Sequence, residues 1–236
     1  MKLHLKRFAA PKTWKIKVRE KVWIVRPKPT GCSLRYTLPI VYIIRDILKL
    51  AKTRKEVRYM INSKQIYLNG KVIKDDKQGC SLFDVIYVQP YNRHYRIIMH
   101  KKKLDLLEIK ESESKISIAK VVKKTVLPKR HAKKENANYI QINLSNGKNF
   151  LTNDNSIKTG CGVIFNFFDN KIVSVIPLEI KSLVYIEKGS HEGEIGTVVE
   201  MDEDECIVEI QGKRRRLKKS YLLPVGKEKS LITLTK

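Results

Sequence analysis

The sequence predicts an α+β protein built from several small modules, in which strands outnumber helices. Residues 38–51, and the segment from Thr53 to Ile61, carry apolar side chains at the 3.6-residue period of two helices. From residue 65 onward, short β-rich runs alternate with Gly, Asn-Gly and Asp-Asn turn signals. A length of 236 residues allows one large domain or two to four small ones, and the changes of pattern favour several small ones.

Positive charge dominates the chain, which has 49 Lys and Arg against 24 Asp and Glu and a formal net charge of +25. The surplus is +10 in residues 1–35, +5 in residues 36–90 and +10 in residues 91–176, whereas residues 177–236 are neutral. Such self-repulsion favours a polyanionic partner, with nucleic acid preferred over an anionic membrane. The chain lacks any uninterrupted apolar stretch of about 18 residues and any signal-peptide pattern, so we expect a cytoplasmic protein with no membrane partner.

Residues 1–35 predict an extended basic arm, because three prolines discourage a continuous helix. Trp14 and Trp23, the only tryptophans of the protein, lie here among Lys and Arg. Either each ring anchors the arm on a neighbouring domain, or a ring stacks on a base or packs on a sugar. The cations beside the two rings are suited to contact phosphates in both cases.

Residues 36–90 predict a small α+β module that begins with two helices. The first helix is expected over residues 38–51, and the second begins at Thr53. There, Thr-Arg-Lys-Glu fits the capping box, in which the Thr side chain accepts from the Glu backbone N–H and the Glu side chain reaches back. Arg54, Lys55 and Arg58 lie off the apolar stripe of the second helix, and Lys64 lies just beyond it. Positive charge is thus expected beside the N-terminus of this helix, where the helix dipole also favours an anion.

A short sheet completes this module. Asn69 and Gly70 separate two β-rich runs and predict a two-residue hairpin turn, because such a turn needs positive φ at both positions. Lys71 projects from that turn or just after it. Residues 81–88 predict a further strand.

Residues 91–176 predict a central β-rich domain, either a barrel or a curled sheet. The strand-rich runs are 115–127, 138–152 and 162–176, and Asn146-Gly147 and Asp169-Asn170 are turn signals that divide the second and the third run into alternating segments. Between the first two runs, the basic segment 127–138 is expected to form a mobile loop that is either simply solvated or in contact with RNA.

Residues 177–236 predict a small five-stranded β-barrel, because short strand runs recur at regular spacing between glycines. Gly189, Gly193 and Gly196 allow positive φ at a tight loop and a close approach of another backbone. The segment is polarised between acidic EMDEDE (200–205) and basic KRRRLKK (213–219).

The residues that usually carry catalysis or bind metals form no recognisable motif. The chain has no phosphate-binding loop of the GxxxxGK[ST] type, no GxSxG elbow and no HExxH. Its four cysteines and five histidines are scattered without zinc-site spacing, so we expect reduced, mostly packed thiols and no metal. The sequence therefore predicts a non-enzymatic protein with no cofactor and no small-molecule substrate.

Four stretches resemble one known family. The pattern VxIxxGxxxGxxGxV at 184–198 resembles the KOW motif of small SH3-like β-barrels, although Glu192 stands where that motif usually has a basic residue. The helix, helix and NGK frame of residues 33–75 is similar to the S4 RNA-binding domain. HLKRFAAPKTW at 4–14 resembles the N-terminal signature of the small-subunit ribosomal protein S4e family, which occurs in archaea and eukaryotes, and IQINLSNGKNFL and DNKIVSVIPLE resemble its central domain. The one local departure elsewhere is Cys32-Ser33, where the family more often has Pro-His.

This resemblance implies a structural constituent of the small ribosomal subunit that stabilises folded ribosomal RNA, with that RNA and neighbouring ribosomal proteins as partners. A free RNA-binding regulator and an accessory of an RNA-modifying enzyme stay open as alternatives. The expected loop glycines are Gly70, Gly189, Gly193 and Gly196. The expected RNA contacts are Lys2, His4, Lys6, Arg7, Lys12, Trp14, Lys15, Arg26, Lys28, Arg54, Lys55, Arg58, Lys64, Lys71, Lys129, Arg130, Lys133, Lys134, Lys188, His191, Arg214 and Arg215.

Overall fold

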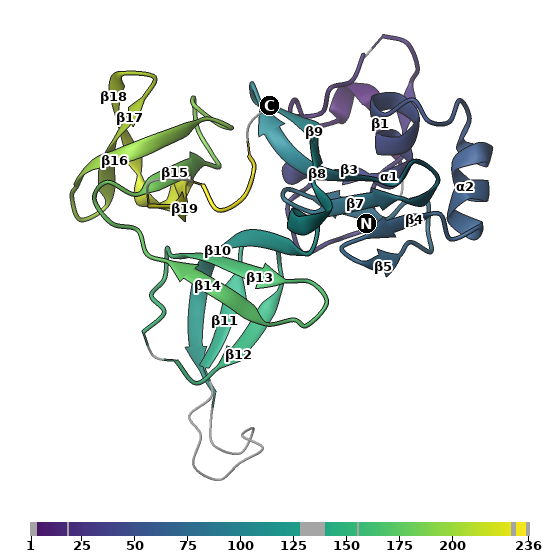
Figure 1. The fold of residues 1–236 in the computed structure, drawn as a ribbon. Coiled ribbons are helices and arrows are strands. Elements are labelled where there is room, and N and C mark those ends of the chain that lie inside the picture. Colours follow the sequence, from purple (N-terminus) through teal and green to yellow (C-terminus); the bar gives the residue numbers. More distant parts are fainter. Residues whose placement is uncertain (1–3, 18, 128–139, 155, 228–229, 235–236) are drawn as a thin grey trace. The chain divides into compact units, whose positions relative to one another are not determined.

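A computed structural model describes residues 4–17, 19–127, 140–154, 156–227 and 230–234 (Figure 1). Contacts between Cα atoms divide the chain into two compact units. The N-terminal unit comprises residues 1–115 with 234–236, and the C-terminal unit comprises residues 116–233. The chain is rich in strands and short of helix, in agreement with the predicted multi-module, β-rich fold.

The arm contains little regular structure. Its strands β1 (Leu5–Lys6) and β2 (Trp23–Ile24) pair in antiparallel fashion, and a 3-10 turn, η1 (Arg7–Ala9), follows β1. A second 3-10 turn, η2 (Leu34–Tyr36), leads into the next module. Proline-rich sequence thus gives a chain with little regular structure, in which the short β1–β2 pairing joins two distant parts of the arm.

The first predicted helix is shorter than its apolar pattern indicates. Strand β3 (Thr37–Pro39) precedes a single α-turn, α1 (Ile40–Tyr42), which widens into a π-helical segment, η3 (Ile43–Ile47). Leu48 N–H donates to the Ile43 carbonyl at 2.9 Å, and Lys49 then has a φ of 56°, which ends the helix. The prediction of a helix over 38–51 is therefore wrong at both ends.

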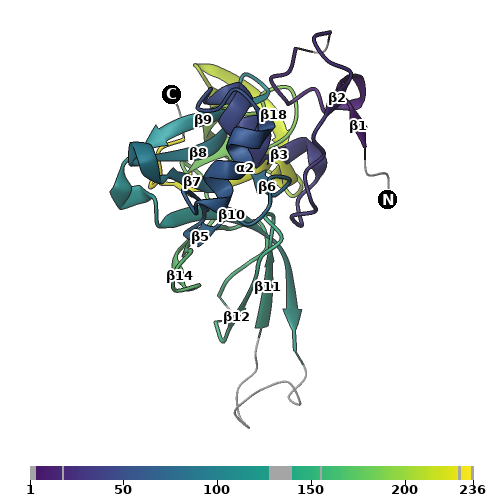
Figure 2. The same ribbon diagram turned by 90° about the vertical axis from the view of Figure 1, so that its right-hand side faces the viewer.

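The second predicted helix is confirmed as α2 (Arg54–Asn62). The Thr53 hydroxyl accepts from the Glu56 N–H at 3.3 Å, and a Glu56 carboxylate oxygen accepts from the Thr53 N–H at 3.4 Å. These two bonds form the expected capping box. Val57 and Ile61 are its buried residues, and Figure 2 shows α2 in front of the strands of this unit.

Five antiparallel strands form the main sheet of the N-terminal unit, in the order β5-β4-β7-β8-β9. Asn69 and Gly70 form the predicted turn between β4 and β5, with φ values of 50° and 76°. The predicted strand over 81–88 is divided into β6, which pairs with β3, and β7, which lies at the centre of the sheet. The strands are β4 (Ile66–Leu68), β5 (Lys71–Val72), β6 (Gly79–Ser81), β7 (Val85–Val88), β8 (Arg93–His100) and β9 (Lys103–Ile109).

This sheet continues past residue 90, where the sequence predicts the start of the central domain. Val85 of β7 pairs with Arg96 of β8, and β9 follows as the edge strand. The β8–β9 hairpin therefore belongs to the N-terminal unit, and the C-terminal unit begins at Ile116. A strand pattern cannot show which neighbour a hairpin selects, because pairing depends on contacts distant in sequence.

Two five-stranded antiparallel sheets make up the C-terminal unit. The first has the order β12-β11-β10-β13-β14, and its strands coincide with the three predicted strand-rich runs. A bulge interrupts β10 between Val121 and Lys123. The strands are β10 (Ile116–Val126), β11 (Ile140–Leu144), β12 (Asn149–Thr152), β13 (Gly162–Asn166) and β14 (Ile172–Ile176).

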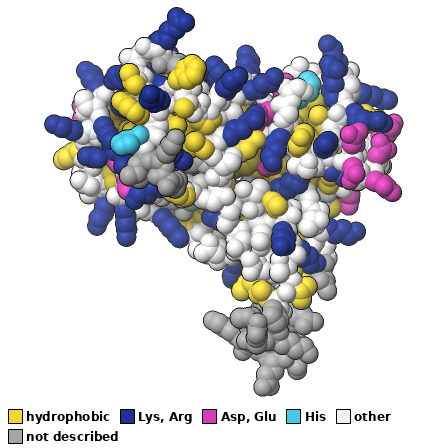
Figure 3. All heavy atoms as spheres, turned by 180° about the vertical axis from the view of Figure 1, so that it is seen from behind, with side chains coloured by type: hydrophobic (Ala, Val, Ile, Leu, Met, Phe, Trp, Pro, Cys, Tyr) yellow, Lys and Arg dark blue, Asp and Glu magenta, His cyan; other side chains and the backbone are white. Residues whose placement is uncertain are grey.

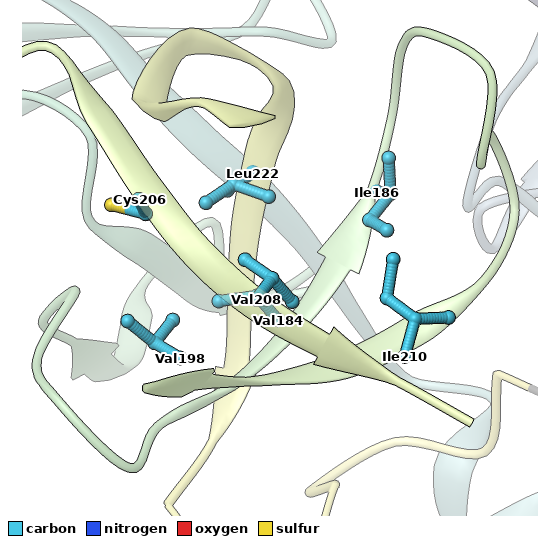
Figure 4. Packing of buried hydrophobic residues seen from close by; sticks show 7 residues of the cluster. All are labelled: Val184, Ile186, Val198, Cys206, Val208, Ile210 and Leu222. Carbon is cyan, nitrogen blue, oxygen red and sulfur yellow. The ribbon is translucent and has the colours of Figure 1, made fainter. Parts of the chain in front are cut away.

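The second sheet has the order β18-β17-β16-β15-β19. Its inward side chains come from four of the strands and form one apolar cluster (Figure 4): Val184, Ile186, Val198, Cys206, Val208, Ile210 and Leu222. The strands are β15 (Leu183–Ile186), β16 (Ile195–Met201), β17 (Glu205–Ile210), β18 (Lys213–Lys218) and β19 (Leu222–Gly226).

Two glycines of this sheet are required for different reasons. Gly193 has a φ of 92°, and its N–H donates to the Ile186 carbonyl at 2.9 Å. Gly196 instead lies where a Cβ would approach Val208 Cγ1 to 2.6 Å and the Glu209 carbonyl oxygen to 2.7 Å. The first glycine therefore supplies a backbone conformation and the second supplies space.

Candidate nucleic-acid interface

A buried carboxylate organises the cations at the start of α2. Asp76 Oδ2 accepts from Arg54 Nε at 2.5 Å and from Arg58 Nε at 2.8 Å. Burial acts to raise the pKa of Asp76, but the bonds from the two arginines outweigh it and lower that pKa to about 2. One fixed negative charge therefore orients two guanidinium groups, and the trio keeps a net charge of +1.

Most of the cations predicted in this module have exposed side chains. The side chain of Arg58 is 57% exposed, and Lys55 beside it is also exposed. Lys64 and Lys71 are exposed as well, at the end of α2 and after the Asn69-Gly70 turn. The structure thus places the five cations predicted in this module at or near the surface, with Arg54 only partly exposed.

Tyr59, which the sequence analysis did not select, is 71% exposed on α2 next to Arg58. An exposed aromatic ring beside cations is a surface on which a base can stack. The exposure of Tyr59 could have been predicted from the sequence, because Tyr59 lies off the apolar stripe formed by Val57 and Ile61.

Two predicted RNA contacts in the arm are buried instead. Trp14 is 3% exposed, stacks on Tyr42 with ring centroids 6.1 Å apart, and donates to the Leu34 carbonyl at 3.3 Å. Arg7 donates to the Lys17 carbonyl at 2.7 Å and lies 3.7 Å from Glu20. Contact of these two side chains with RNA does not agree with the structure, which supports the alternative that Trp14 anchors the arm.

Trp23 has the opposite environment. Its side chain is 57% exposed, Lys6 Nζ lies 5.8 Å from its ring centroid and the His4 ring lies 5.9 Å away. The ring is therefore presented between two cationic or ionisable side chains, an arrangement suited to stacking on a base.

The other predicted cations of the arm differ in their surroundings. Lys12 and Lys15 are exposed, and Arg26 is partly exposed. Lys28 forms an ion pair with Asp75, and its N–H donates to the Lys77 carbonyl at 2.8 Å. These two contacts hold the arm against the segment that carries Asp76.

In the C-terminal unit, Lys188 is exposed, and His191 Nδ1 lies 3.1 Å from a Glu194 carboxylate oxygen. Glu192, which departs from the KOW pattern, is buried. Arg214 and Arg215 are exposed on β18, which is an edge strand. Gly189 has a φ of 105°, as expected for its turn.

The remaining predicted contacts, Lys2, Lys129, Arg130, Lys133 and Lys134, lie outside the described residues. The basic segment 127–138 lies outside them too, except for Leu127. Over the face drawn in Figure 3, Lys and Arg side chains are widely distributed, whereas Asp and Glu gather mainly at one place. In the part of the chain that is described, no helix has the length and apolar character needed to cross a membrane.

Three family models match the chain in sequence order. The RS4NT domain matches residues 1–29, the S4 domain matches residues 40–86, and the Ribosomal family S4e matches residues 91–172. They follow the order that the sequence resemblance implies.

Archaeal proteins and solved structures match over most of the chain. The small ribosomal subunit protein eS4 of Nanoarchaeum equitans is 37% identical over 203 residues, covering 85% of this chain and 83% of the relative. The eS4 protein of Staphylothermus marinus is 32% identical over 249 residues, covering 99% and 96%. The crystal structure of 30S ribosomal protein S4e from Thermoplasma acidophilum superposes with a TM-score of 0.67 at 25% identity, covering 81% of this chain and 95% of that one.

Proposed function

The chain belongs to the S4e family of small ribosomal subunit proteins, and we propose that it works as a structural constituent of that subunit. It binds ribosomal RNA through exposed cations and performs no chemistry of its own. Ribosomal RNA and neighbouring small-subunit proteins are its partners, and the cytoplasm is its compartment.

The observation that carries this proposal is the cationic cluster at the start of α2. Asp76 fixes the guanidinium groups of Arg54 and Arg58, so less side-chain freedom is lost when they meet a phosphate. Lys55 adds an exposed charge beside the helix N-terminus, where the dipole also favours an anion. Contacts of this kind position RNA through its backbone and do not read its bases.

The other segments extend the same mode of binding. We assign Lys6, Lys12 and the exposed ring of Trp23 in the arm to RNA, together with Arg214 and Arg215 on β18. The sheet of β15 to β19 is assigned as the SH3-like barrel of the KOW type. Its buried Glu192 argues against a phosphate contact at that position and leaves Lys188 as the cation of the loop.

A double substitution tests the placement on α2. Replacing Lys55 and Arg58 by Ala removes two exposed cations and keeps Arg54 on Asp76. Filter binding to purified small-subunit ribosomal RNA is expected to weaken, and the slope of log K against log salt to fall by about 1.4–1.8 for two lost phosphate contacts.

Lys227→Ala serves as a control, because the Lys227 side chain is 75% exposed but its Nζ lies 3.6 Å from Glu179. It is expected to bind like the unmodified chain. Equal affinity of the double variant and the control, with both folded by circular dichroism, would contradict the assignment of α2.

A further inference from the structure

A cleft of about 550 Å³ lies between the arm and the β8–β9 hairpin of the N-terminal unit. Its lining residues are Lys15, His100, Lys101, Lys103 and Asp105. Three of the five side chains are cationic and a fourth is an ionisable histidine. Among the described lining residues the one carboxylate, of Asp105, lies 3.7 Å from Lys15 Nζ. The lining therefore carries an excess of positive charge in a concave site, where charge of one sign concentrates the local potential.

The arm side of the cleft is held by contacts of Lys15 and of the two residues before it. The Thr13 carbonyl accepts from the Leu104 N–H of β9 at 2.8 Å. The Lys15 carbonyl accepts from the Tyr42 hydroxyl at 2.6 Å, and Trp14 stacks on that same tyrosine. Burial raises the pKa of Tyr42 to about 12, so the hydroxyl stays protonated and keeps donating. The backbone of Lys15 is thus fixed before any ligand binds, and its side chain stays 60% exposed.

The hairpin side contains an unfavourable turn. His100 pairs with Lys103, so Lys101 and Lys102 form a two-residue loop. Their φ values are 48° and 62°, which non-glycine residues rarely adopt. Asn-Gly is strongly preferred in such a loop, and the same sheet has that pair in its other two-residue turn, at Asn69-Gly70. The protein therefore carries two lysines where the local backbone favours other residues.

Strained backbone of this kind points to a role for the side chains it presents. We propose that this cleft is an additional phosphate-binding site, in which Lys15, Lys101 and Lys103 bind the sugar-phosphate backbone of RNA. This rests on the proposed function of the chain in binding ribosomal RNA. No aromatic residue lines the described cleft other than the ring of His100, so the contact is made to phosphate and is independent of base sequence.

Two single substitutions in the turn separate the site from its surroundings. Lys101→Asn removes a cation that lines the cleft, and Lys102→Gly removes its neighbour, which does not line it. Each removes one positive charge, and each places a residue that tolerates positive φ. The full chain with either substitution is bound to purified small-subunit ribosomal RNA over a salt series and is melted in parallel.

Both variants are expected to melt about 2–4 °C higher than the unmodified chain, because the strain of one residue is relieved. Only Lys101→Asn is expected to lower affinity and to reduce the slope of log K against log salt by about 0.7–0.9, the loss of one phosphate contact. Lys102→Gly is expected to keep the slope of the unmodified chain.

If Lys101→Asn and the unmodified chain have the same slope of log K against log salt, the phosphate site is overturned and the proposed function is left intact. The same conclusion follows if Lys101→Asn and Lys102→Gly lose the same affinity and slope. A fall in melting temperature for both variants overturns the argument from strain. Absence of RNA binding by the unmodified chain overturns the proposed function itself, and the site with it.

Discussion

Asp76 shows how a single residue prepares a binding surface. Two long guanidinium side chains on one face of α2 repel each other and lose rotamer freedom when a phosphate fixes them. Asp76 removes most of both costs, because its one carboxylate oxygen accepts from both Nε atoms. The Asp76 carboxylate neutralises one of the two positive charges, and it holds the remaining net charge of +1 in a defined position.

Asp76→Asn tests this residue. The pKa of Asp76 in the folded chain is about 2, below its ordinary value of 3.8. Its carboxylate therefore stabilises the fold fully above about pH 4 and loses this contribution as the pH falls through 2. Since Arg58 is half exposed and screened by solvent, we expect a loss of about 1–2 kcal/mol at pH 7.

Urea unfolding of both proteins at pH 7 and at pH 2 measures this effect. The difference between Asp76→Asn and the unmodified chain is expected to fall to a small part of its pH 7 value at pH 2, because Asp76 is then about half protonated in the folded chain and almost fully protonated in the unfolded chain. A difference of the same size at the two pH values would rule out the ion pair as its cause.

At the scale of elements, the sequence predicted features that neighbouring residues determine, and it did not predict features that depend on residues distant in the chain. The capping box at Thr53 and the Asn69-Gly70 turn were predictable because neighbouring residues alone decide them. The π-helical segment after Tyr42 was not predictable, because a run of buried apolar residues gives the same sequence pattern in an α-helix and in a π-helix. The sequence of the β8–β9 hairpin likewise has the composition of two strands, but it does not indicate that β8 pairs with β7.

The candidate site divides in the same way. The exposed cations of α2 could be found from the helical period, since they lie off the apolar stripe. The burial of Arg7 and Trp14 could not, because it depends on how the arm packs against residues 17 to 42. The cleft at Lys15 was missed for the same reason, since its other lining residues lie some 85 positions further along the chain.

Gly193→Val tests the loop between β15 and β16. Gly193 has a φ of 92°, and a β-branched residue is strongly disfavoured there. We expect the C-terminal unit to lose about 1–3 kcal/mol of stability, measured as a lower unfolding midpoint in urea.

Gly212→Asn is the control for this prediction. Gly212 also has a positive φ, 76°, but nothing lies within 4 Å of an added Cβ, and Asn tolerates this conformation. Its unfolding midpoint is expected to stay close to that of the unmodified chain. An unchanged midpoint for Gly193→Val would show that the loop can adopt another conformation at little cost.

At the scale of the whole molecule, the net charge of +25 is the property that the fold must accommodate. Among the described residues few cations are buried, and those that are, namely Arg7, Arg96 and Lys120, have partners within their own unit. Most of the positive charge therefore stays at the surface, where a polyanion can neutralise it. The acidic residues 202–204 are exposed on the turn after β16, and Asp202 lies 3.6 Å from Arg216 of β18, so one cation of that strand is already paired.

The salt dependence of binding between the full chain and purified small-subunit ribosomal RNA tests the central claim most directly. If surface cations on several segments replace counterions of the RNA, log K falls linearly with log salt, and each phosphate contact contributes about 0.7–0.9 to the slope. With contacts from the arm, α2 and β18, we expect affinity to fall by orders of magnitude between about 50 and 200 mM salt. Affinity that is independent of salt, or absent at low ionic strength, would contradict the account.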